Sequence, residues 1–86
     1  MSKLPVASIN TPEYDALLDL LREVRKEKRM SQEKLSEKLR QSRNYIGKIE
    51  QKDRRFDVVE FYEVFTVLGV DPVDVFARFA AKVRGK

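Results

Sequence analysis

The chain has 86 residues, of which 42% are hydrophobic and 37% are charged, and its 18 basic and 14 acidic side chains give a net charge of +4. That length suits one domain with a small core. Because the chain contains neither histidine nor cysteine, it lacks the commonest general base and metal ligand and has no thiol nucleophile. We therefore expect a binding protein without a cofactor or metal site, and not an enzyme. No apolar stretch approaches the ~18 residues of a membrane span and no secretory signal is recognisable, so we expect a cytoplasmic protein without membrane contact.

Charge is unevenly distributed along the chain. Residues 22–55 hold 13 basic and six acidic side chains, a net charge of +7, which leaves −3 for the remainder. Between Phe56 and Ala77 every charged side chain is acidic. A basic half of this kind favours a polyanionic partner. The alternative is that the lysines and arginines only solvate the faces of helices.

The first predicted helix follows an N-terminal segment without sustained periodicity. We expect residues 1–10 to form a flexible arm and residues 11–84 to form the domain. Thr11 is a suitable N-cap because proline and an acidic residue follow it, as is typical of the first helical positions. Apolar residues at three- and four-residue spacing then continue the helix to about Lys28.

Two short helices come next, joined by a tight turn. Ser31 is placed to cap the second helix, whose inner face carries Leu35 and Leu39 one turn apart. Only two residues separate Leu39 from Ser42, the next capping candidate. We expect Ser42 to begin a third helix over residues 43–51. Two short helices in this arrangement are typical of a helix-turn-helix.

The last two helices each begin at an acidic capping motif. Asp57 and Glu60 have the spacing of a capping box for a fourth helix, which Gly69 is suited to end. Asp71 begins a fifth helix in the same way, with proline at its first helical position. Since the chain contains no hairpin signal and no internal repeat, the predicted class is all-α with five helices.

The third predicted helix has two opposed faces. At 100° per residue, Tyr45, Ile46 and Ile49 form an apolar stripe that is suited to packing. The opposite face presents a guanidinium, an amide, a bare backbone position and an ammonium, groups that match base edges and phosphates; they belong to Arg43, Asn44, Gly47 and Lys48. The alternative is an ordinary amphipathic surface helix.

Residues 32–50 resemble the phage-repressor/Cro type of helix-turn-helix, also called the XRE family. The matching string is Gln32-x-x-Leu35-Ser36-x-x-Leu39-Arg40-Gln41-Ser42-x-x-x-Ile46-x-x-Ile49-Glu50. The resemblance extends to Arg25 and Ser31 before the motif and to residues 54–59 and 68–72 after it, and covers about residues 17–76. It implies a five-helix, lambda-repressor-like bundle with the helix-turn-helix at about residues 32–51.

The resemblance also implies roles for individual residues. Arg43, Asn44, Gly47 and Lys48 would read bases in the major groove, Gly47 by letting the backbone approach the DNA. Arg25 and Glu50 would form an ion pair between the first helix and the end of the third; the alternative is a solvated pair worth under ~1 kcal/mol. The candidate phosphate contacts are Gln32, Ser42, Tyr45, Lys52, Arg54 and Arg55, of which the last three otherwise belong to a plain solvated loop.

Two residues depart from the family pattern. Alanine is usual at the position of Ser36, where a hydroxyl would enter a tight contact between helices. Glycine is usual at the position of Arg40, where the turn adopts a left-handed backbone that costs a non-glycine residue ~1 kcal/mol or more. These departures bear on the angle at which the motif docks more than on the fold.

The fifth helix presents a wide apolar face. Phe76, Phe79 and Val83 either pack inside the bundle or form a twofold contact with a second copy, and we favour a homodimer. The function that we expect is a sequence-specific regulator of transcription that binds double-stranded DNA and acts as a repressor. The alternative is a protein-interaction module, such as an antitoxin-like or adaptor protein, that uses the acidic fourth and fifth helices and binds DNA only secondarily.

Overall fold

A computed structural model describes residues 10–85, which form five α-helices and no strand. The helices are α1 (Pro12–Glu27), α2 (Gln32–Lys38), α3 (Tyr45–Glu50), α4 (Val58–Val67) and α5 (Pro72–Arg84). The predicted all-α class and the number of helices are therefore confirmed. The predicted arm lies outside the described residues except for Asn10. None of the described helices has the length and apolar character needed to cross a membrane.

Four of the five helices begin at the predicted caps. Thr11 and Ser31 each accept a hydrogen bond from the backbone N–H three residues on, at 3.1 and 3.0 Å. Asp57 and Glu60 form the reciprocal capping box, with bonds of 2.8 and 3.0 Å. Asp71 accepts from the N–H two residues on at 2.9 Å. These bonds satisfy donors that a helix start leaves without a partner.

The start of α3 differs from the prediction. The helix begins at Tyr45 and not at residue 43, and the side chain of its N-cap, Asn44, makes no capping bond. Ser42 is not the cap, because its carbonyl accepts the Tyr45 N–H at 3.0 Å in a turn that precedes the helix. Arg43 and Asn44 therefore project from this turn, at the very start of α3.

Each of the first four helices is followed, two positions beyond its last residue, by a residue with a left-handed backbone. At the end of α4 this residue is Gly69, with φ +84°, which glycine adopts without strain. The same position after α1, α2 and α3 is occupied by Arg29, Arg40 and Lys52, with φ of +56°, +59° and +67°. The left-handed conformation predicted for Arg40 is thus confirmed, and two further residues share its strain.

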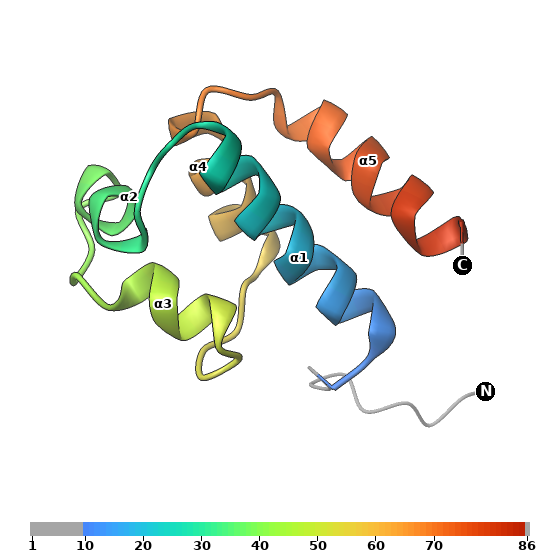
Figure 1. The fold of residues 1–86 in the computed structure, drawn as a ribbon, viewed down its shortest axis with the longest axis horizontal. Helices are drawn as coiled ribbons and strands as arrows, with labels where there is room; N and C mark the ends of the chain where they lie inside the picture. The colour runs from blue at the N-terminus through green and yellow to red at the C-terminus, as the bar shows by residue number, and fades with distance from the viewer. Residues whose placement is uncertain (1–9, 86) are drawn as a thin grey trace.

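The core lies where α1 meets the other helices. α1 packs against α3 and α5, while α2 packs against α3 and α4. In Figure 1, α2 and α3 lie together on one side of α1 and α5 runs along the other side. The side chains at the centre are fully buried and include Leu21, Val24, Leu35, Ile46, Ile49, Val64 and Phe65.

Candidate nucleic-acid interface

Glu50, the last residue of α3, lies in a buried ion pair with Arg25 of α1. The Arg25 Nε and Nη2 atoms donate to the two carboxylate oxygens of Glu50 at 2.8 and 3.0 Å. The two side chains are only 9% and 2% exposed. The expected pair is therefore present, and its burial rules out the alternative of a solvated pair. Bidentate geometry of this kind fixes direction as well as distance.

Two further residues that we had not predicted as its partners converge on Glu50. Arg22, one turn before Arg25 on α1, donates to the Glu50 backbone carbonyl at 2.6 Å. Gln32, the first residue of α2, donates to a carboxylate oxygen of Glu50 at 2.9 Å. One acidic residue therefore links α1, α2 and the end of α3. The only local signal for Arg22 was its three-residue spacing from Arg25, which places both on one helix face.

Packing inside the protein explains why a glycine occupies position 47. A Cβ at this position would lie 3.3 Å from the side-chain oxygen of Gln32, which is closer than an ordinary van der Waals contact. The absence of a side chain thus lets the Gln32 amide cross α3 on its way to Glu50. The structure thus gives Gly47 a contact between α3 and the Gln32 side chain of α2, which the sequence did not predict.

Ser36 replaces the missing cap of α3. Its hydroxyl is fully buried, donates to the Gln32 carbonyl at 2.8 Å and accepts from the Ile46 N–H at 3.0 Å. That N–H lies in the first turn of α3, where a donor has no partner within the helix. The departure from alanine at this position therefore supplies a hydrogen bond that fixes α3 relative to α2.

The exposed ends of α2 and α3 form a polar depression. It contains all four predicted base-reading residues, and its lining consists of Gln32, Glu33, Arg43, Asn44, Gly47, Lys48, Gln51 and Asp53. Two carboxylates, Glu33 and Asp53, were not among the predicted site residues. Glu33 accepts a hydrogen bond from Arg43 Nη2 at 2.9 Å, which raises the pKa of Arg43.

The predicted phosphate contacts are in unlike environments. Ser42 and Arg55 are exposed, and Lys52 is paired with Asp15 of α1. Arg54 forms an ion pair with Glu60 and lies over the Tyr45 ring, 4.8 Å from its centroid. Lys52 and Arg54 therefore hold the loop between α3 and α4 through their ion pairs, and they also give this loop positive charge.

Tyr45 is placed differently from the other five. Its ring is 6% exposed and its hydroxyl donates to Glu60 at 2.9 Å. Burial, together with this bond to a carboxylate, raises the pKa of the Tyr45 hydroxyl. Since the hydroxyl already has a partner inside the protein, we leave Tyr45 out of the proposed phosphate contacts.

A second depression, which is apolar, lies between α4 and α5. Phe76 is 57% exposed there, next to Val58 at 79% and Val73 at 74%. Phe79 is partly buried and contacts the Phe76 ring, with 5.6 Å between centroids. Val83 is partly buried as well and is not part of the lining.

Within residues 10–85, no cluster of acidic side chains suits a metal ion.

Comparison with known proteins identifies the class. Residues 21–75 match the family described as "Helix-turn-helix". A solved structure of an "XRE-family like protein from Pseudomonas syringae pv. tomato str. DC3000" superposes with a TM-score of 0.76 and 35% sequence identity, over 80% of this chain and 84% of that chain. No curated protein matches the chain significantly. The chain belongs to the XRE family of helix-turn-helix proteins, a family of DNA-binding transcription regulators and not of enzymes.

Proposed function

We propose that this protein is a sequence-specific repressor that binds double-stranded DNA with α3 in the major groove. The observation that carries the proposal is the polar depression, in which Arg43, Asn44 and Lys48 are exposed at one end of the motif. An arginine suits guanine, an asparagine suits adenine, and a lysine suits guanine or a phosphate. Occupation of an operator would repress by excluding the transcription machinery.

Around this base-reading surface, phosphate contacts would supply most of the affinity. Glu50 holds one amide N–H of Gln32, and the other is available for a phosphate. Ser42, Lys52, Arg54 and Arg55 would add contacts on either side of α3. With ~6–8 phosphate contacts in a dimer, the logarithm of the binding constant is expected to fall with the logarithm of salt concentration at a slope near −6.

We further propose that the protein acts as a homodimer in the cytoplasm. The exposed rings and methyl groups around Phe76 form a contiguous apolar area that a second copy would cover, with Phe79 beside it and Val83 at its edge. A twofold dimer of this motif places its two recognition helices ~34 Å apart, one turn of DNA. The same apolar area, next to the acidic side chains of α4 and α5, also suits a protein partner, which is the second candidate function.

Selection of bound sites from a random pool of duplex DNA tests the proposal. We expect a preferred sequence with twofold symmetry. Substitution Arg43→Ala or Asn44→Ala should remove ~1–3 kcal/mol of discrimination at one base pair, while Arg55→Ala should weaken binding to all sequences alike. A wild-type protein that enriches no sequence, or one that co-purifies with a tight protein partner and does not bind DNA, would contradict the proposal.

A further inference from the structure

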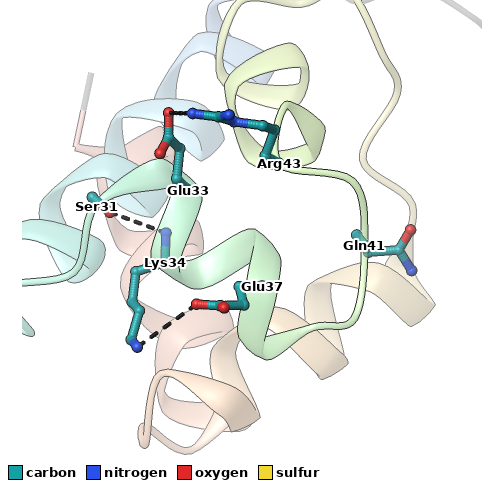
Figure 2. Close-up of a pocket in the computed structure, with 6 residues that line it drawn as sticks. All are labelled: Ser31, Glu33, Lys34, Glu37, Gln41 and Arg43. Atoms are coloured by element: carbon teal, nitrogen blue, oxygen red, sulfur yellow. Dashed lines mark hydrogen bonds and ion pairs between the residues drawn. The ribbon is translucent and has the colours of Figure 1, made fainter.

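Glu33 is an acidic residue on a surface that we propose faces DNA. It is the second residue of α2, and its carboxylate accepts a hydrogen bond from Arg43 at 2.9 Å, with side chains 65% and 75% exposed. Figure 2 shows the two side chains reaching toward each other from α2 and from the turn before α3. Glu33 also lines the polar depression that contains the base-reading residues.

As an acidic residue in the first turn of α2, Glu33 interacts favourably with the helix dipole, but neither folding nor attraction to DNA requires that it pair with Arg43. An ion pair as exposed as Glu33 and Arg43 contributes little to stability. A carboxylate facing DNA is repelled by the phosphates, so its presence lowers non-specific affinity. The second acidic residue of α2, Glu37, is paired with Lys34 at 3.7 Å and not with Arg43 (Figure 2).

We propose that Glu33 is a positioning residue that directs Arg43 to a guanine edge and away from the phosphate backbone. The inference rests on the proposed function and adds a determinant of its specificity. The bond uses a single N–H of a guanidinium that has five. The remaining donors suffice for the two acceptors, O6 and N7, that guanine presents in the major groove.

Charge and geometry act together in this arrangement. Pairing offsets the positive charge of Arg43, which reduces its general attraction to phosphates but leaves its directional hydrogen bonds. When DNA covers the depression, water is excluded and the effective dielectric constant falls, so the Glu33–Arg43 attraction grows in the bound state. An arginine already held in one orientation also loses less conformational freedom on binding.

The test compares Glu33→Ala with Glu37→Ala, since each removes one negative charge from an exposed position of the same helix. Affinities are measured for the selected site, for the same site with the base pair read by Arg43 replaced, and for random duplex DNA. Discrimination is the ratio of the affinity for the selected site to the affinity for the site with the replaced base pair. Because both affinities are measured on one preparation, this ratio is independent of the folded fraction. Thermal unfolding followed by circular dichroism checks that both variants fold.

For Glu33→Ala, we expect discrimination at the Arg43 base pair to fall about tenfold while affinity for random DNA rises. For Glu37→Ala, affinity for random DNA should rise and discrimination should stay at the wild-type value. In the Arg43→Ala background, Glu33→Ala should have no effect on discrimination at that base pair.

Three results would overturn the inference. Equal discrimination in the two single variants would mean that Glu33 acts only through net charge. A rise in discrimination for Glu33→Ala would mean that the carboxylate holds Arg43 off the bases. An undiminished effect in the Arg43→Ala background would mean that Glu33 acts elsewhere. A wild-type protein without any preferred sequence would instead refute the proposed function itself.

Discussion

At the scale of single residues, the carboxylate of Glu50 connects three helices. It accepts hydrogen bonds from Arg25 and Gln32, and the same residue's carbonyl accepts from Arg22. Because Glu50 ends α3 and its partners lie on α1 and α2, these bonds fix the direction of the proposed recognition helix. A charge buried to this degree is tolerated only when its partners are in place.

Removal of this carboxylate should be costly. Glu50→Ala leaves the guanidinium of Arg25 buried without its partner, so we expect a loss of ~3–5 kcal/mol in the free energy of unfolding. Urea denaturation measures the loss. The control is Glu23→Ala, which removes an exposed pair with Lys82 and should cost under ~1 kcal/mol. Equal losses in the two variants would show that the buried cluster does not hold α3.

A second prediction at the residue scale concerns Gly47. In Gly47→Ala the new methyl group displaces the Gln32 amide from α3 and weakens its bond to Glu50, while alanine raises helix propensity by ~1 kcal/mol. Since these effects oppose each other, we expect a near-unchanged melting temperature together with weaker binding to all DNA sequences. Calorimetry and a fluorescence binding assay measure the two. An alanine variant that binds DNA as well as the wild type would contradict this role of Gln32.

At the scale of elements, four helices begin at local capping side chains, whereas α3 depends on a contact from another helix. The starts of α1, α2, α4 and α5 are determined by side chains within three residues of the first turn. α3 is too short to be stable by itself, and its first turn is completed by Ser36 of α2. The helix-turn-helix is therefore one hydrogen-bonded unit and not two independent helices.

The turn inside this unit contains a strained residue that can be relieved. Arg40 has φ +59° after α2, a conformation that costs an L-residue ~1 kcal/mol or more and suits glycine. We expect Arg40→Gly to stabilise the protein by ~1 kcal/mol, which raises the melting temperature by about 4–8 °C in a domain of this size. Scanning calorimetry measures the shift.

The matched control is Lys34→Gly in the interior of α2, which should destabilise by ~1 kcal/mol because glycine is a poor helix former. If both glycine variants lower the melting temperature, Arg40 makes a stabilising contact that outweighs its backbone strain.

At the scale of the whole molecule, the basic and acidic parts of the chain lie on different helices. The +7 of residues 22–55 extends from the second half of α1 to the loop after α3, whereas α4 carries only acidic charges. The polar depression is lined by α2, α3 and the residues on either side of α3, whereas the apolar depression lies between α4 and α5. This separation is compatible with simultaneous contact to DNA and to a second copy.

The proposed dimer makes a prediction at this scale. Phe76→Glu places a charge in the apolar depression, so we expect it to convert a dimer into a monomer with little loss of fold, because Phe76 is 57% exposed. Analytical ultracentrifugation measures the mass. Val59→Glu is the control, since Val59 is 61% exposed but does not line the depression. A wild-type protein that is monomeric both alone and on DNA would contradict the homodimer.

The amino-acid sequence by itself determined those features that depend on neighbouring residues or on a motif shared by a family. Caps, apolar spacing and the helix-turn-helix string predicted five helices, the family and the Arg25–Glu50 pair. The start of α3 was predicted wrongly, because the N-cap is Asn44 and not Ser42, and the N–H of Ile46 in the first turn donates to Ser36, ten residues earlier in the chain. Local patterns reach only three or four residues along a helix.

Only the tertiary structure decided the contacts between residues distant in the chain. In the folded protein Gln32 donates to Glu50, the Tyr45 hydroxyl donates to Glu60 and Arg43 donates to Glu33. The tertiary structure also left Phe76 exposed where the sequence had allowed either burial or a dimer contact. The physical reason is that burial and pairing depend on which helices meet, and helical periodicity alone does not specify that meeting.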